Sequence, residues 1–221
     1  MAIYVTSDAH GHVRALDEAL SKISLTSDDT LYVLGDMIDR GPDPVGVIKL
    51  VRSLPNARVL KGNHEQIMLD AIIGQDPLDA ETWDINGGWT TRQQLNDMEF
   101  EAYEELVRWM ATLPLYAVAE TDERPYLLVH AGIETEAARA FLLEHGVDCA
   151  DGAGAVSADR ELLKQMLAVQ SSDDLLWIRH GYWDAPTGLL SAEGKGPVVV
   201  SGHTPTVSLG RYCEVGGLAG L

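Results

Sequence analysis

The chain has 221 residues, of which 46% are hydrophobic and 23% are charged, enough for one sizeable core but too few for two comfortable domains. Its formal net charge of −18 and its pI near 4.6 argue against a long nucleic acid or an anionic membrane as the main partner, because the field of the protein repels phosphates at a distance. A phosphorylated substrate would therefore need cations placed locally at its binding site.

The first part of the chain alternates strands and helices. Short apolar runs predict strands, helical spacing of apolar residues predicts helices, and alternation of the two predicts a largely parallel α/β sheet. In chain order the expected elements are a strand over 2–5, a helix over 13–23, a strand over 31–34, a helix over 44–54, a strand over 57–60 and a helix over 65–73.

The chain changes character over residues 74–113. A loop at 74–77 precedes a stretch from Ala80 to Leu113 that is rich in tryptophan and predicted to be helical. We interpret 74–113 as a mostly helical insertion in a single domain spanning 1–221, acting as a flank or lid over the site; simple coverage of the sheet is an equally compatible interpretation. Two further strands are expected at 126–129 and 198–200.

Each of the five predicted strands is followed directly by metal-ligand or acid/base residues. In chain order these residues are Asp8 and His10; Asp36, Asp39 and Arg40; Asn63 and His64; His130; and His203. Taken singly, such an aspartate is usually a turn former and such a histidine a satisfied polar residue. Because ligands of open α/β sheets bind beyond the carboxyl ends of strands, five such clusters together favour one site.

The residue types in these clusters suit a pair of divalent metal ions. Asp8 and His10 offer a carboxylate and an imidazole from one loop, and Asp36 can bridge two metals with its two oxygens. A second set of ligands follows from the later clusters and consists of Asn63, His130 and His203. Two ions about 3.5–4 Å apart could hold a bridging hydroxide and clamp a phosphoryl oxygen.

The remaining residues suggest a proton donor and a phosphate clamp. Asn63 and His64 are adjacent, so their side chains diverge, and His64 is better placed as a general acid than as a second ligand. Asp39 could hydrogen-bond the His64 imidazole and hold its orientation. Arg40 could bind nonbridging phosphate oxygens with its forked donors; Arg179 could do the same or form a surface salt bridge.

These residues resemble the signatures of the phosphoprotein phosphatase family of calcineurin-like metallophosphoesterases. The matching segments are Asp8-Ala9-His10-Gly11, Gly35-Asp36-Met37-Ile38-Asp39-Arg40-Gly41, Gly62-Asn63-His64-Glu65, Leu175-Leu176-Trp177-Ile178-Arg179, His130-Ala131-Gly132 and Gly202-His203-Thr204-Pro205. The resemblance implies an α/β fold with a four-layer β-sandwich of two mixed sheets flanked by helices. It also implies two divalent metal ions, with manganese as the first choice and iron, zinc, nickel or cobalt as alternatives. The reaction it implies is direct attack of metal-bound hydroxide on phosphorus.

Carried over residue by residue, the resemblance repeats the assignment made above. Asp8, His10 and Asp36 would hold one metal, and Asp36, Asn63, His130 and His203 the other, with Asn63 also facing the substrate phosphate. Three departures stand out: Ser7 replaces a usual glycine, His180 replaces a usual acidic residue, and 212–221 offers only a Gly-rich remnant of the final strands, which predicts a shortened sheet edge.

We therefore expect a bimetal phosphomonoester hydrolase, most simply a bacterial- or phage-type serine/threonine or dual-specificity protein phosphatase with a phosphoprotein or small phosphoester as substrate. The alternatives are a hydrolase of symmetrical dinucleoside polyphosphates such as diadenosine tetraphosphate, a nucleotide phosphatase, and a non-catalytic phosphate-binding relative. Because neither a leader peptide, a membrane span nor a disulfide framework is evident, we expect a cytoplasmic protein without a membrane partner. The sequence leaves the oligomeric state and the native metals open.

Overall fold

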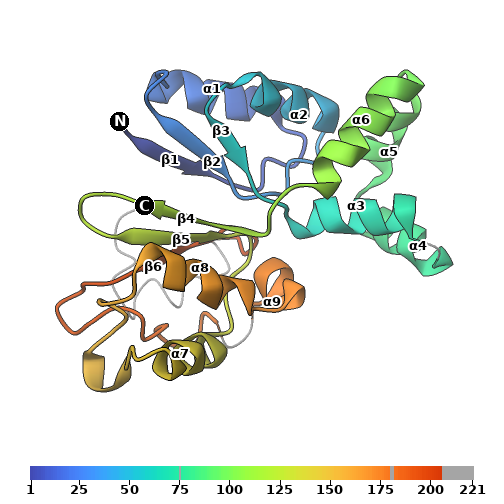
Figure 1. Ribbon diagram of the computed structural model, residues 1–221. Coiled ribbons are helices and arrows are strands. Elements are labelled where there is room, and N and C mark those ends of the chain that lie inside the picture. The colour runs from blue at the N-terminus through green and yellow to red at the C-terminus, as the bar shows by residue number, and fades with distance from the viewer. Residues whose placement is uncertain (75, 180–181, 206–221) are drawn as a thin grey trace. The chain divides into compact units, whose positions relative to one another are not determined.

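The computed structural model describes residues 1–74, 76–179 and 182–205. It divides the chain into two compact units, Met1–Pro114 and Leu115–Leu221, and each unit contains a small sheet with helices against it (Figure 1). The predicted α/β class, with two sheets flanked by helices, is confirmed. The assignment of residues 1–221 to a single domain with an insertion remains a prediction.

The sheet of the first unit is parallel throughout its described strands. β1 (Ile3–Thr6), β2 (Thr30–Val33) and β3 (Ala57–Val59) lie in that order, with Leu31 opposite both Tyr4 and Ala57. The crossovers are α1 (Val13–Ile23) and α2 (Pro44–Ser53). α2 begins where the sequence favours it: Pro44 occupies the first turn, and the Asp43 carboxylate accepts a hydrogen bond from the Gly46 backbone N–H.

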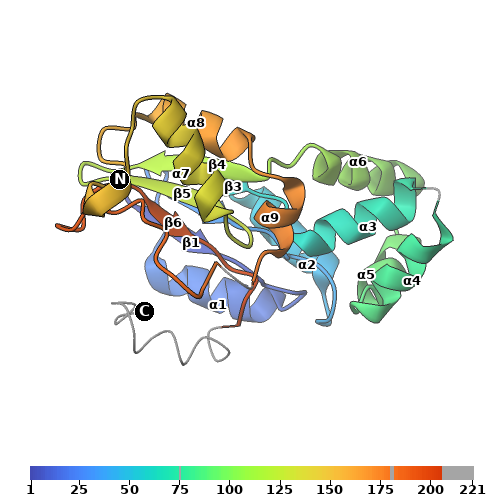
Figure 2. The ribbon, with the colours of Figure 1, turned by 90° about the horizontal axis from the view of Figure 1, so that it is seen from below.

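Four further helices lie together at one end of the first unit, as Figures 1 and 2 show from two directions. They are α3 (Asn63–Ile73), α4 (Pro77–Ile85), α5 (Trp89–Asn96) and α6 (Phe100–Ala111). The stretch expected to be helical over 80–113 is thus three short helices, of which α4 and α6 pack on α3 and α5 packs on α2. Trp83, Leu95, Leu106 and Met110 from these helices are buried in the same core as Leu31, Val33 and Ile48.

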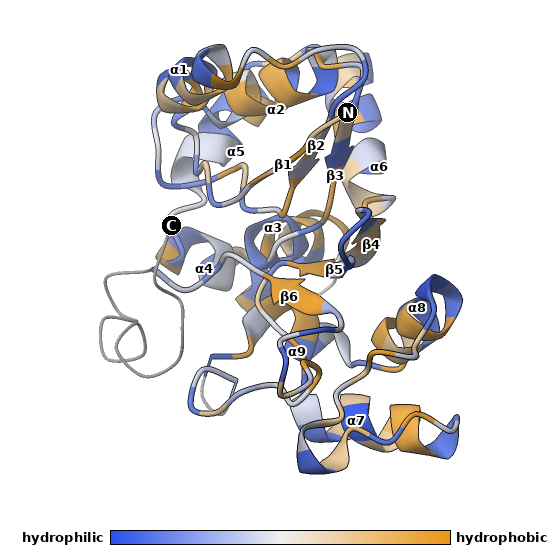
Figure 3. Ribbon diagram, turned by 90° about the vertical axis from the view of Figure 1, so that its left-hand side faces the viewer, coloured by the Kyte–Doolittle hydropathy of each residue, from blue (hydrophilic) through white to orange (hydrophobic). Residues whose placement is uncertain are grey.

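The sheet of the second unit is mixed. β4 (Tyr116–Glu120) pairs antiparallel with β5 (Pro125–Val129), and β5 pairs parallel with β6 (Val198–Val200), which is apolar along its length (Figure 3). The predicted strands 126–129 and 198–200 are confirmed, whereas β4 was not predicted. The helices of this unit are α7 (Thr135–Glu144), α8 (Arg160–Ala168), α9 (Ser172–Trp177) and a 3-10 turn at Ala150–Gly152.

The second unit has its own hydrophobic core, in which Leu127 and Val129 of β5 pack with Leu142 of α7 and Leu163 of α8. The predicted shortening of the C-terminal strands over 212–221, together with His180, lies outside the described residues. Within the described ranges, no helix is both long and apolar enough to cross a membrane.

Candidate metal and phosphate site

Three of the five predicted clusters meet at one edge of the first unit. Because β1, β2 and β3 are parallel neighbours, the loops that follow them leave the sheet from the same edge. Backbone hydrogen bonds join these loops: the Asp8 N–H donates to Gly35 O over 3.2 Å, and the His10 N–H donates to Asp36 O over 2.9 Å. Asn63, 3% exposed, begins α3 directly after the third strand.

Imidazole and carboxylate atoms of His10, Asp36 and His64 face one another at this edge of the sheet, and we call these three residues the edge cluster. His10 Nε2 lies 3.5 Å from Asp36 Oδ2, His64 Nε2 lies 4.0 Å from the same oxygen, and the donor atoms of the three residues all lie within 4.8 Å of one another. His10 Nδ1 is 2.9 Å from Ile38 O, which fixes the proton on Nδ1 and leaves the Nε2 lone pair facing Asp36. The structure thus places His64 where it could also act as a ligand, in addition to the catalytic role predicted for it.

The charges in the edge cluster favour a bound cation. Burial lowers the pKa of His10 to about 4, so its imidazole is neutral and able to ligate at neutral pH. Burial, followed by the charges of Glu65 and Asp8, raises the pKa of Asp36 well above its ordinary value. A divalent cation would offset this accumulation of negative charge. The donor set therefore fits the transition metals expected from the sequence.

Glu65 joins the loop that follows β2 to the loop that follows β3. Its carboxylate, which is fully buried, accepts the backbone N–H groups of Asp36, Met37 and Gly62, each over 2.8 Å. Burial raises the pKa of Glu65, and these three donors oppose the rise. Glu65 was not among the predicted site residues, although a glutamate three residues after a helix N-cap is a recognisable signal.

Backbone strain is concentrated at the candidate site residues. Eight non-glycine residues in the described part of the chain have positive φ, and six of them are Asp8, His10, Asp36, Asp39, Arg40 and His203. Such residues persist only where their surroundings hold them, and they cluster at functional sites.

His64 and Asp39 form the pair that the sequence predicted. His64 Nδ1 lies 2.7 Å from Asp39 Oδ2, and both side chains are fully buried. Arg40 reaches over the edge cluster, with Nη1 3.1 Å from His10 Nε2 and Nη2 2.8 Å from His64 Nε2. Its guanidinium therefore lies among the candidate ligands, at a place suited to an anionic substrate group.

The second unit brings together the other three predicted residues. His130 follows β5 immediately, His203 follows β6, and His130 Nε2 lies 3.2 Å from His203 Nδ1. The Gly202 N–H donates to His130 O over 2.8 Å and joins the two loops. The Arg179 Nε donates to His203 Nε2 over 2.9 Å, so Arg179 lies beside the histidine pair.

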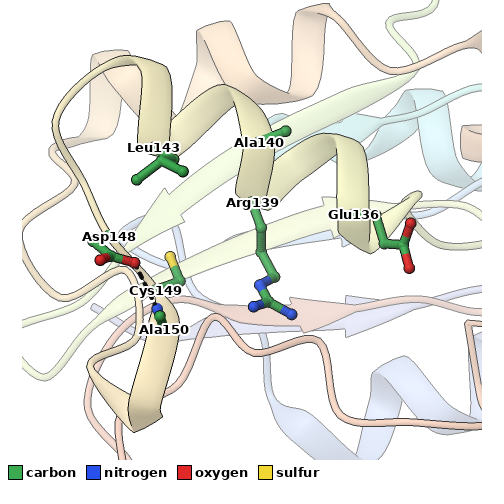
Figure 4. A pocket seen from close by; sticks show the side chains of 7 residues that line it. All are labelled: Glu136, Arg139, Ala140, Leu143, Asp148, Cys149 and Ala150. Atoms are coloured by element: carbon green, nitrogen blue, oxygen red, sulfur yellow. Dashed lines mark hydrogen bonds between the residues drawn. The ribbon is translucent and has the colours of Figure 1, made fainter.

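A cavity of about 380 Å³ lies elsewhere in the second unit, beside α7 (Figure 4). It is lined by Glu136, Arg139, Ala140, Leu143, Asp148, Cys149 and Ala150, none of which was predicted as a site residue. Burial raises the pKa of the Cys149 thiol, which therefore stays protonated at neutral pH.

Comparison with known proteins identifies the family to which the chain belongs. The chain belongs to the calcineurin-like phosphoesterase family, whose model matches residues 1–217. Calcineurin-like phosphoesterases use a dinuclear metal centre, for which the described residues include candidate ligands.

Two of the similar proteins are bacterial enzymes that share one name. A symmetrical bis(5'-nucleosyl)-tetraphosphatase of Erwinia tasmaniensis is 32% identical over 136 residues, which cover 60% of this chain and 45% of that protein. The enzyme of the same name from Proteus mirabilis is 29% identical over 220 residues, covering 96% of this chain and 68% of that protein. The chain thus spans less than half of the first relative. A solved metallophosphoesterase from Sphaerobacter thermophilus is 27% identical, with a TM-score of 0.42 over 59% of this chain and 46% of that one.

Proposed function

We propose that this protein is a metal-dependent phosphoric ester hydrolase. The observation that carries the proposal is the edge cluster, where imidazole and carboxylate donors within 4.8 Å of one another adjoin the buried His64–Asp39 pair. A proton donor, a guanidinium and metal ligands in one place are what phosphoryl transfer to water requires.

The proposed metal ligands are those predicted from the sequence, namely Asp8, His10, Asp36, Asn63, His130 and His203. When bound, two divalent ions would polarise the phosphoryl oxygens and lower the pKa of a coordinated water. The residues of the chain supply the rest. Arg40 and Arg179 bind nonbridging oxygens with their forked donors, and Asp39 orients His64. We keep His64 as the proton donor because Asp39 engages its Nδ1 and leaves Nε2 facing the cluster.

As substrate we propose a symmetrical dinucleoside polyphosphate in place of a phosphoprotein. Support for this choice comes from the names of the two bacterial relatives, one of which aligns over 96% of this chain. In the reaction, the oxygen of water forms a bond to phosphorus and the bridging P–O bond breaks. His64 gives the proton carried on Nε2 to the departing nucleoside diphosphate, the attacking water releases one proton that restores His64, and the products are two nucleoside diphosphates. The serine/threonine phosphatase interpretation remains the competing hypothesis, since the motifs of that family are also present.

A substrate panel tests the proposal. Purified protein is incubated with manganese, iron, zinc, nickel or cobalt and with diadenosine tetraphosphate, a phosphoserine peptide, a nucleotide or p-nitrophenyl phosphate. Diadenosine tetraphosphate should give ADP with the highest kcat/KM. Faster release of phosphate from the peptide would favour the protein phosphatase instead, and no turnover of any substrate by folded, metal-loaded protein would favour the non-catalytic alternative.

The role of His64 is tested in the same preparation. We expect His64→Asn to lower kcat by about 100-fold or more while the metal content measured by elemental analysis stays close to that of the wild type. Loss of metal in this variant would instead identify His64 as a ligand.

A further inference from the structure

The Asp39 carboxylate is surrounded by donors from helices far along the chain. The Trp83 Nε1–H of α4 lies 3.1 Å from Asp39 Oδ1 and 3.2 Å from Oδ2, and the Thr91 hydroxyl of α5 donates to Oδ1 over 2.6 Å. Trp83 is 3% exposed, and Thr91 and Asp39 are fully buried. Buried hydrogen bonds to an ionised acceptor are short and strong because water does not compete for the carboxylate.

The Thr91 hydroxyl has only one possible orientation. Its oxygen also accepts the Asp39 backbone N–H over 2.9 Å, so its single proton must point to Asp39 Oδ1. Thr91 thus holds both the backbone and the side chain of Asp39. This matters because Asp39 and Arg40 are consecutive non-glycine residues with φ of 67° and 65°, and the Arg40 N–H is held in turn by Gly87 O over 3.0 Å.

The fixed Asp39 carboxylate determines how the His64 imidazole is oriented. With the Thr91 hydroxyl on Oδ1 and the Trp83 N–H shared between the two oxygens, the Asp39 carboxylate cannot rotate without losing a buried hydrogen bond, and its Oδ2 also accepts from His64 Nδ1 over 2.7 Å. That bond keeps a proton on Nδ1 and directs Nε2, the nitrogen from which the donated proton leaves, toward the edge cluster, 4.0 Å from Asp36 Oδ2 and 2.8 Å from Arg40 Nη2.

We propose that Trp83 and Thr91 are positioning residues for the proton donor: by fixing the Asp39 carboxylate they set the tautomer and the orientation of His64. Neither residue touches the substrate. This role rests on the proposed function, because it gives the two helices α4 and α5 a part in hydrolysis. Both residues lie in the segment 74–113, which the sequence predicts to be a flank or lid, so part of that segment would position His64.

The first test is spectroscopic and needs no activity. Long-range ¹H–¹⁵N spectra of metal-free protein report which nitrogen of His64 carries the proton. Wild type and Thr91→Ser should show one Nδ1–H form, because serine keeps the hydroxyl. Thr91→Val and Trp83→Phe should show a mixture of tautomers. The proposal is overturned if both of these variants keep the single Nδ1–H form.

Thr90 provides a matched control. It precedes Thr91, it is 7% exposed, and in the part of the chain that the structure describes its Oγ1 is buried without a hydrogen-bond partner. Thr90→Val should therefore keep the wild-type spectrum and turnover. If it perturbs His64 as much as Thr91→Val does, the effect comes from α5 as a whole and the positioning role is refuted.

Kinetics with diadenosine tetraphosphate then separate this inference from the proposed function. We expect kcat to fall about 10- to 100-fold in Thr91→Val with KM nearly unchanged, and Thr91→Ser to recover most of the loss. Trp83→Phe is a second variant on another helix, which removes the N–H donor together with three heavy atoms of the buried indole, so urea unfolding must show that both variants are folded before their kinetics are compared. A wild-type protein that turns over no substrate refutes the hydrolase, while its tautomer spectra still decide the role of Trp83 and Thr91.

Discussion

Replacing Gly62 with alanine would test whether the close approach of the second and third loops holds the site together. Gly62 has φ −96° and ψ 175°, values that alanine adopts readily, so the substitution adds no backbone strain of its own. A Cβ at this position would, however, overlap the Asp36 backbone N and Oδ1 and lie 2.8 Å from Glu65 Oε2. The loops must move apart to admit it.

We expect Gly62→Ala to lower the free energy of unfolding by about 2–6 kcal/mol, from overpacking of about 1–3 kcal/mol and one broken buried hydrogen bond of similar cost. Metal content and turnover should fall together, because the added methyl group meets the Asp36 carboxylate. Urea unfolding, elemental analysis and initial rates measure the three effects.

Gly146 supplies the contrasting control for this experiment. It has φ +84° and nothing within 4 Å of an added Cβ, so Gly146→Ala should cost about 1 kcal/mol through backbone strain alone and leave metal and turnover unchanged. A Gly62→Ala protein as stable and as active as the wild type would refute the argument.

Three further predictions concern single interactions. Burial raises the pKa of Tyr182 to about 12 from 10, so the folded state holds the phenolic proton more tightly than the unfolded state does. The stabilisation is fully present below pH 10, and the free energy of unfolding should fall by about 2 kcal/mol between pH 10 and pH 12. When both proteins are unfolded in urea, Tyr182→Phe should show a shallower fall. Glu65→Gln keeps only one acceptor oxygen for three N–H donors, so the free energy of unfolding measured in urea should fall by about 1–3 kcal/mol. The control Glu81→Gln, at an exposed position, should change it little. Equal effects of the two substitutions would contradict the role given to Glu65. Asp43→Ala removes the N-cap of α2 and should cost about 1 kcal/mol at unchanged metal content; loss of metal would show that the cap also supports the site.

Local patterns in the sequence were sufficient to place the candidate ligands. Each cluster directly follows an apolar run, so the position of Asp36 or His130 after its strand depends only on neighbouring residues. The His64–Asp39 pair was also predictable, because both residues follow adjacent parallel strands.

Other features had no local signal. β4 is held by its antiparallel partner β5, and its residues precede no ligand cluster. The donors Trp83 and Thr91 lie 44 and 52 residues from Asp39 along the chain, and nothing near them in the sequence indicates which buried carboxylate they meet. Only the packing of α4 and α5 within the first unit brings them together.

The positive φ values at Asp39 and Arg40 carry a consequence for attempts to make this protein more robust. An aspartate or arginine in the left-handed region costs on the order of 1 kcal/mol, and asparagine or glycine is tolerated there more readily. Selection for a higher melting temperature would therefore favour Arg40→Gly. Asp39 is different, because its buried carboxylate accepts from three donors that an asparagine amide would not match. A screen for stability would thus remove the guanidinium beside His64, so thermal stability and turnover should trade against each other at Arg40, and a useful thermostable variant must gain its stability elsewhere.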